Sequence, residues 1–348
     1  MKTYKNLDDL IFELKNKGVT INDDKYAKNI LEKYGYYSIV NSYKDIFKDN
    51  KGNYKKGVTF EEIVALFQFD LSIRHIFLKF IFEIEYKIKT SISELLCENY
   101  SLNDYLKVNN FDNNINSNII KNMINIITEE INKQKDNHQA INHFYYTYGF
   151  IPPYVLVKIL TLGQISKLYN ILKQQDRQKI SKQFGVSDKE LMQIIKNITL
   201  VRNICCHNDR LFSYHSKFYL PLKKIHPNYK RGSTYSTNMF LILKSIQFIL
   251  KSDSLETLIY QEIYKLKDNI KSVNIKLVLN LMGIPDTLKK YKIYDIDENG
   301  TIKIYDKFLY RNKDLSTKTK IKILSEYFYE TIQNFDEKFN NLKISSII

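Results

Sequence analysis

Residues 201–212, with the sequence VRNICCHNDRLF, carry side chains that could act on a phosphate group. The stretch holds two of the chain's six arginines, Arg202 and Arg210, and one of its six histidines, His207, whereas lysine supplies most of the positive charge elsewhere. Arginine offers a planar, permanently charged fork that suits phosphate, and histidine titrates near neutral pH. We therefore take this stretch as the first candidate for a functional site.

Arginine and histidine together are a minimal set for cleaving RNA. Imidazole can accept the proton of the ribose 2′-OH or donate one to the leaving 5′-oxygen, while arginine neutralises the charge that builds on the phosphorane. Because the 2′-OH is already tethered beside the phosphate, this reaction needs no metal ion. These residue types predict metal-independent cleavage of RNA, with no cofactor.

Helical periodicity divides the region that contains the motif into two faces. Successive residues of an α-helix turn by about 100°, so one apolar stripe should face the core; it consists of Leu191, Ile194, Ile198, Val201 and Cys205. Asn203, His207 and Arg210 fall on a second stripe, with Arg202 beside it. A polar stripe can be no more than a solvated helix face. In a lysine-rich chain, the concentration of arginine and histidine argues against that interpretation.

The spacing of Arg202 and His207 predicts that two copies of the chain form the site. The two residues are five apart, or roughly 140° around an ideal helix. One helix would need distortion to aim both side chains at one phosphate. Two copies facing each other across a two-fold axis could instead build a shared cleft, so we expect a homodimer.

Capping and turn signals outline the elements that must position the motif. Ser187 and Glu190 match a capping box that starts a helix over about 188–208, and Thr59 and Glu62 match one that starts a long apolar helix to about Cys97. Ser91–Ser93 is the one place where that helix could break. The remaining expectations are a helix over 119–139, a helix that begins at IPPY (151–154) and includes VLVKILTLGQISKLYNIL, a hairpin over 291–306 with an Asn299–Gly300 turn, and a last helix over 316–343.

Composition favours a mainly helical protein. The 348 residues include only 10 glycines and 5 prolines, which is few for an all-β fold with its many turns. We predict an all-α helical bundle divided into an N-terminal helical region (1–58), a main domain (59–285) and a C-terminal extension of hairpin and helix (286–348).

Net charge and cysteine content limit the possible partners and the cellular location of the protein. A net charge of +15 suggests a polyanionic partner, most simply nucleic acid, although the abundance of Lys, Asn, Ile and Tyr that an AT-rich genome produces explains it equally well. The most apolar stretch, 63–82, contains Asp70, Arg74, His75 and Lys79, which predicts a core helix and no membrane partner. The three cysteines form no C-x-x-C pair. We expect a soluble protein of the reducing cytoplasm.

The motif resembles the signature of the HEPN superfamily, in which an arginine and a polar residue are followed by a histidine after four to six residues. RNICCHNDRLF is similar in particular to the RNxxxHxxRL motif of HEPN-type abortive-infection (Abi) proteins of the AbiD/AbiF type. Four other stretches resemble blocks of that family in the same order: residues 16–43, 60–92, 152–169 and 282–285. Together these segments cover roughly residues 1–285.

This resemblance implies an all-α HEPN-type fold, a homodimer and a metal-independent endoribonuclease that acts as a toxin in phage defence or toxin–antitoxin systems. AbiF-like members are linked with structured noncoding RNAs, so an inhibitory RNA is a second expected partner. By position, Arg202, Asn203 and His207 are the catalytic residues, and Arg210 and Asn208 are RNA-binding residues. The chain departs from the family pattern at Ser38 and Lys89, where arginine is favoured.

Glu85 and Lys89 are candidate supporting residues. At i, i+4 they should form an ion pair, and Glu85 could orient Arg202 if it lies near the catalytic helix. Neither residue is expected to bind a metal.

Other interpretations of individual residues remain open. Cys206 and His207 could suggest a thiol nucleophile, but adjacent residues on a helix point about 100° apart. His138 and His143 lack further ligands at metal-binding spacing and are expected in a loop or the core. Asp295, Asp297, Asn299 and Asp306 resemble part of a calcium-binding loop, yet the alternating apolar and polar residues on both sides favour a hairpin.

A protein that binds RNA without cleaving it is the alternative function. Such a protein would keep the HEPN fold and bind a structured noncoding RNA, and its binding would be strongly salt-dependent.

Overall fold

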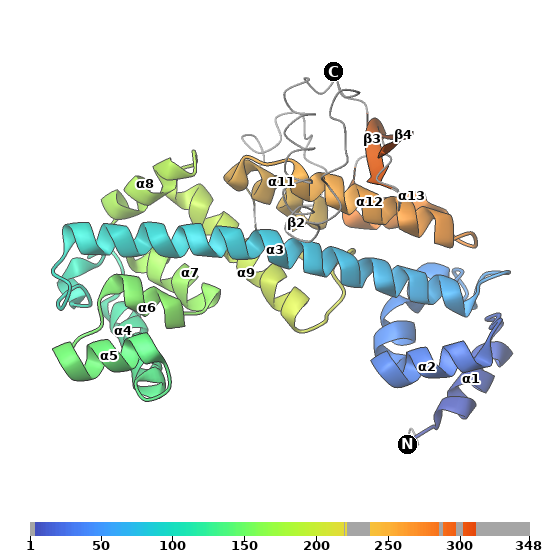
Figure 1. Ribbon diagram of the computed structural model, residues 1–348, viewed down its shortest axis with the longest axis horizontal. Coiled ribbons are helices and arrows are strands. Elements are labelled where there is room, and N and C mark those ends of the chain that lie inside the picture. Colours follow the sequence, from blue (N-terminus) through green and yellow to red (C-terminus); the bar gives the residue numbers. More distant parts are fainter. Residues whose placement is uncertain (1–3, 219, 221–236, 285–287, 297–301, 311–348) are drawn as a thin grey trace, which may run out of the picture. The chain divides into compact units, whose positions relative to one another are not determined.

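The computed structural model describes residues 4–218, 220, 237–284, 288–296 and 302–310 (Figure 1). Helices dominate these residues, and the only strands among them form two small two-stranded sheets. The prediction of an all-α fold is confirmed. The helix expected over 316–343 lies outside the described residues.

The chain forms two compact units, which we describe separately. One comprises Met1–Phe69 and Ser252–Ile348, and the other comprises Asp70–Lys251. The domain boundaries after residues 58 and 285 that we expected from sequence remain predictions.

The first unit contains the helices at the two ends of the described chain. Its elements are α1 (Leu7–Asn16), α2 (Asp24–Tyr34), the π-helical η1 (Tyr37–Asn41), the 3-10 helix η2 (Lys44–Phe47), α12 (Ser254–Asn269), α13 (Ile275–Met282) and the strands β3 (Leu288–Ile296) and β4 (Ile302–Tyr310). The side chains of Asn6 and Asp23 accept hydrogen bonds from the first turns of α1 and α2. These caps satisfy backbone N–H groups that a helix start leaves unpaired.

The second unit contains the helix that carries the motif. Its elements are η3 (Val108–Asn110), α4 (Ser117–Gln134), α5 (Gln139–Tyr148), α6 (Pro153–Ile159), α7 (Leu162–Ile171), α8 (Gln174–Gln183), α9 (Asp188–Cys206), α11 (Met239–Leu250) and the strands β1 (His215–Ser216) and β2 (Thr237–Asn238). Helices α7, α8 and α11 pack against α9. This packing explains why the apolar stripe of α9 is buried.

Helix α3 (Phe60–Asn99) begins in the first unit and continues in the second (Figure 1). It starts with the predicted capping box, in which Thr59 and Glu62 exchange side-chain-to-backbone hydrogen bonds of 3.1 and 3.2 Å. The helix does not break at Ser91–Ser93. The hydroxyl of Ser91 donates to Gln183 of α8 and that of Ser93 to the Thr90 carbonyl, so both are satisfied without leaving the helix.

Two of the predicted helices differ in extent from the observed ones. The helix expected over 119–139 corresponds to α4, which ends at Gln134. Helix α5 begins only at Gln139, and His138 before it accepts a hydrogen bond from the N–H of Ile141. The helix expected from IPPY is divided between α6 and α7, because Thr161 and Gln164 form a capping box that starts a new helix. Apolar periodicity continues across the interruption between α6 and α7, and it therefore did not reveal that interruption.

The predicted hairpin is present. Strands β3 and β4 pair antiparallel, with Ile296 opposite Ile302 and Asp295 opposite Lys303. The segment with calcium-loop-like spacing is thus flanked by paired strands, as the hairpin interpretation requires. The Asn299–Gly300 turn itself lies outside the described residues.

Within the described parts of the chain, every helix is too short or too polar to span a bilayer.

Candidate active site

The motif lies at the C-terminal end of α9, and its apolar stripe is buried as predicted. Val201 and Ile198 are at most 1% exposed and Cys205 is 5% exposed, and the earlier members of the stripe, Leu191 and Ile194, are fully buried. The end of α9 that carries the motif is therefore held against the core of the second unit.

The polar stripe is exposed as predicted. Asn203, His207 and Arg210 face solvent, and Arg202 beside them is half-buried. The Nε of Arg202 is buried and has no hydrogen-bond acceptor among the described residues. An unpaired buried donor is unusual in proteins, which marks this guanidinium as a group with unused binding capacity.

Helix α9 ends earlier than the sequence predicted. We expected the helix to include residue 208, but it ends at Cys206, and His207 is its C-cap. The N–H of His207 still donates to the Asn203 carbonyl at 2.9 Å, and the N–H of Asp209 donates to the Ile204 carbonyl at 3.1 Å. Asn208 between them has a φ of 60°, the left-handed conformation that closes many helices and that Asn tolerates better than most residues. His207 therefore stands at the helix end.

Two buried charges on α3, Asp70 and Arg74, hold the chain that follows His207. The Asp70 carboxylate accepts hydrogen bonds from the backbone N–H groups of Leu211 (3.1 Å) and Phe212 (2.7 Å). The Nη1 of Arg74 donates to the Asn208 side chain at 3.2 Å. Sequence reasoning used both residues only as evidence against a membrane span. Their signal was a pair of opposite charges four residues apart in an otherwise apolar helix, which is typical of a buried ion pair.

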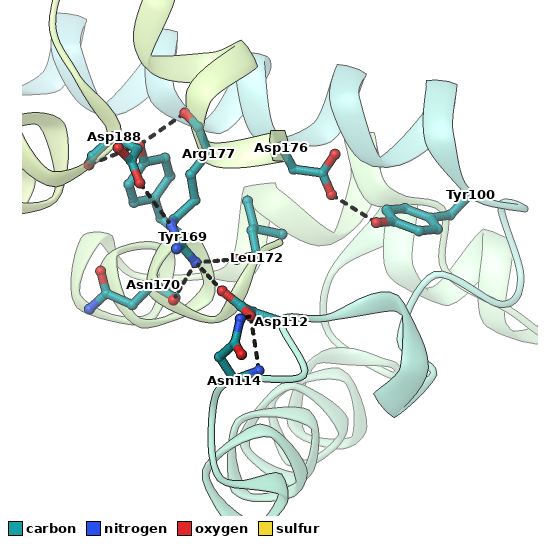
Figure 2. A network of polar contacts seen from close by, with 9 residues as sticks. All are labelled: Tyr100, Asp112, Asn114, Tyr169, Asn170, Leu172, Asp176, Arg177 and Asp188. Atoms are coloured by element: carbon teal, nitrogen blue, oxygen red, sulfur yellow. Dashed lines mark hydrogen bonds and ion pairs between the residues drawn. The ribbon is translucent and has the colours of Figure 1, made fainter. Parts of the chain in front are cut away.

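A second buried network holds the start of α9 (Figure 2). Arg177 of α8 lies 3.7 Å from the carboxylate of Asp188, the first residue of α9, and 3.2 Å from that of Asp112. It also donates to the backbone carbonyls of Asn170 and Leu172. The predicted capping box of Ser187 and Glu190 forms at the same end of the helix; this network and the cap together define where α9 starts.

The hydroxyl of Tyr169 joins the same network, because it donates to the carbonyls of Arg177 and Asp188. Nearby, Asp176 accepts from Asn99 and Tyr100 at 2.8 Å. Burial, and then the hydrogen bond to Asp176, raises the pKa of Tyr100. Hydrogen bonds from the Asn114 backbone and from Arg177 lower the pKa of Asp112. The Asp112 carboxylate is therefore kept as an acceptor at neutral pH.

The supporting pair Glu85 and Lys89 forms as predicted. Lys89 Nζ lies 2.8 Å from Glu85 Oε1, and both side chains are largely buried. The other carboxylate oxygen of Glu85 is buried without a partner in the described structure. No hydrogen bond joins either residue to Arg202 in that part of the chain, and a supporting role for them remains a prediction.

No hydrogen bond joins a cysteine thiol to His207 among the described residues, and Cys205 is unsuited to act as a nucleophile. All three thiols are free, and burial raises the pKa of Cys205 to about 12, far from the thiolate that a nucleophile needs. Cys206 is exposed but is adjacent to the C-cap. His138 caps α5 and the ring of His143 contacts Phe144 and Tyr148, which agrees with structural roles for both histidines.

Asn208 occupies a structural position as well as a predicted functional one. Its Oδ1 accepts the hydrogen bond from Arg74, and its backbone closes α9. The catalytic roles of Arg202, Asn203 and His207 and the RNA-binding roles of Arg210 and Asn208 remain predictions.

Comparison with known proteins gives one assignment. The family model described as Abi-like protein matches residues 29–213, a range that includes α3, α9 and the whole motif. No curated protein and no solved structure matches the chain. Since the matched range is more than half of the chain, the protein belongs to the Abi-like family.

Proposed function

We propose that this protein is a metal-independent endoribonuclease of the HEPN type that acts as a toxin in abortive infection, the bacterial defence against phage. The observation that carries the proposal is the exposed end of α9, where Arg202, Asn203, His207 and Arg210 gather on a firmly anchored segment. Membership of the Abi-like family suggests the defence role. RNA is the substrate that these side chains and the net charge of +15 favour.

Each side chain has a defined task in the proposed reaction. His207 removes the proton from the 2′-OH and returns one to the leaving 5′-oxygen, so the products carry 2′,3′-cyclic phosphate and 5′-hydroxyl ends. Arg202 stabilises the charge of the phosphorane, and Asn203 and Arg210 orient the phosphate. The partial exposure of Arg202 supports its assignment, and its buried Nε has no acceptor among the described residues.

The regular backbone of α9 supports a site made by two copies. The helix continues undistorted through Cys206, and the His207 N–H still makes the helical hydrogen bond to Asn203. Arg202 and His207 therefore keep the roughly 140° separation of an ideal helix. A two-fold arrangement of two chains brings the arginine of one toward the histidine of the other without bending either helix.

His207→Ala and Arg202→Ala test the activity. We expect each to reduce cleavage of single-stranded RNA by about 100-fold or more, because each removes a group that acts in the transition state. The measurement is the cleavage rate of a labelled RNA, with analysis of the product ends. Cys206→Ala is the matched control, since it changes an exposed neighbour that has no task in the reaction.

Two results would contradict the proposal. Equal cleavage by wild type and both variants would remove the assigned roles. RNA binding without any cleavage, unchanged in His207→Ala and steeply salt-dependent, would instead identify a non-catalytic RNA-binding protein.

A further inference from the structure

Asp70 and Arg74 are the two fully buried charges closest to the motif. They lie on successive turns of α3 and are 0% and 1% exposed. Arg74 Nε lies 3.6 Å from the Asp70 carboxylate and also donates to the Asp70 backbone carbonyl at 3.3 Å. The two residues of the pair thus contact each other on one helix, and both also contact the motif.

The pair holds the chain at two points that bracket Asp209 and Arg210. Arg74 contacts the Asn208 side chain, and Asp70 contacts the N–H groups of Leu211 and Phe212. A chain held at the Asn208 side chain and at the Leu211 N–H leaves little freedom for the two residues between them, and His207 immediately precedes the first point. The contacts therefore restrict the positions of both exposed candidate residues, His207 and Arg210.

Apolar packing already buries this segment without the ion pair. Cys205, Leu211 and Phe212 are at most 5% exposed and would hold it against the core. Desolvating two charges costs several kcal/mol, and well-packed apolar residues of similar size often stabilise as well or better. What hydrogen bonds add to apolar contacts is direction, since they specify one backbone path.

We propose that Asp70 and Arg74 are positioning residues for the candidate active site: they fix the backbone of residues 208–212 and thereby set where the His207 imidazole and the Arg210 guanidinium stand. The functional part of this proposal rests on the proposed RNA cleavage. Neither residue touches the substrate. Their effect passes through Asn208 and through the N–H groups of Leu211 and Phe212.

The first test compares this pair with the buried ion pair of Arg177 and Asp188 at the start of α9. Arg74→Lys keeps the charge but loses the fork that reaches both Asn208 and Asp70. We expect kcat for RNA cleavage to fall about 10–100-fold with KM within about twofold, because a displacement near 1 Å is enough for such a loss. Arg177→Lys is the matched control: it weakens the pair at the opposite end of α9, and we expect its kcat, per folded protein, to stay near wild type.

The second test needs no activity and remains informative if Arg74→Lys folds poorly. Asp70→Asn removes the carboxylate that accepts from Leu211 and Phe212, so we expect amide hydrogen exchange in residues 208–213 to accelerate more than exchange in α7. Unchanged exchange in Asp70→Asn, or equal loss of kcat in Arg74→Lys and Arg177→Lys, would overturn the positioning role. If wild type cleaves no RNA in a His207-dependent way, the proposed function fails, while hydrogen exchange still decides whether the pair fixes the segment.

Discussion

Arg74 and Arg177 are the two buried arginines among the described residues, and each serves several partners with one guanidinium. Arg74 reaches Asn208 and Asp70, and Arg177 reaches two carboxylates and two backbone carbonyls. Lysine presents a single charged point and cannot satisfy such divergent acceptors. The two other arginines in the described chain, Arg202 and Arg210, belong to the motif. Among the described residues, both buried arginines thus stand where a fork is needed.

Asp112→Asn should destabilise the fold at neutral pH. It removes the buried negative charge that pairs with Arg177, which we expect to lower the free energy of unfolding by about 1–3 kcal/mol. Because the pKa of Asp112 is lowered in the folded state, its contribution is present above the unfolded pKa and is lost as the pH falls through the folded value. Urea unfolding at pH 7 and pH 3 should therefore show a smaller difference between variant and wild type at pH 3.

Asp104→Asn is the control for this prediction. Asp104 forms an exposed ion pair with Lys107, and such pairs contribute little to stability. A difference that stays constant between the two pH values in Asp112→Asn would contradict the assigned role of its charge.

Helix α9 is secured at both ends by contacts of different origin. At its start, a local capping box works together with Arg177, and at its end α3 supplies Asp70 and Arg74. The cap involves residues three apart in sequence, whereas the α3 contacts join residues more than 130 apart. A defect at one end should therefore leave the geometry of the other end intact.

Ser187→Ala separates the two ends experimentally. Loss of the N-cap hydroxyl should lower the free energy of unfolding by about 1 kcal/mol. RNA cleavage per folded protein should stay near wild type, because the motif is held at the opposite end of α9. Thermal unfolding and cleavage rates measure the two effects. Ser187→Thr, which keeps a hydroxyl, should restore most of the stability; a loss of cleavage in Ser187→Ala beyond its unfolded fraction would show that the ends are coupled.

At the scale of the whole molecule, the proposed site requires a second copy of the chain. The regular geometry of α9 keeps Arg202 and His207 on different sides of one helix, and the second unit positions them firmly. A homodimer is thus part of the proposed mechanism, and the mechanism predicts the behaviour of mixed chains.

Mixing Arg202→Ala with His207→Ala chains tests this mechanism. If the arginine of one copy works with the histidine of the other, about half of the dimers in a random mixture are mixed dimers with one intact site. A wild-type dimer has two such sites, so activity should recover to about a quarter of wild type. The measurement is the cleavage rate after the two inactive variants are unfolded and refolded together. The variants refolded separately are the control. No recovery in the mixture, although the two chains associate, would place both groups of each site on one chain.

Much of the candidate site was predictable from local sequence. The buried and exposed faces of α9 follow from a period of 3.6 residues, and its start follows from the Ser187–Glu190 cap, because both depend on residues within a few turns of each other. The end of α4 at Gln134 and the division between α6 and α7 were missed. For the division, the signal was the Thr161–Gln164 capping box, which is weaker than the apolar period that continues across it.

The sequence by itself determined that this chain is mainly helical and which side chains of α9 face solvent, since periodicity and capping act locally. Only the tertiary structure decided where α9 ends and how the motif is held. Those features depend on Asp70 and Arg74, which are brought to residues 208–212 by packing across more than 130 residues of chain. Local patterns contain no information about such a contact, because it forms only when α3 and the end of α9 are already packed together.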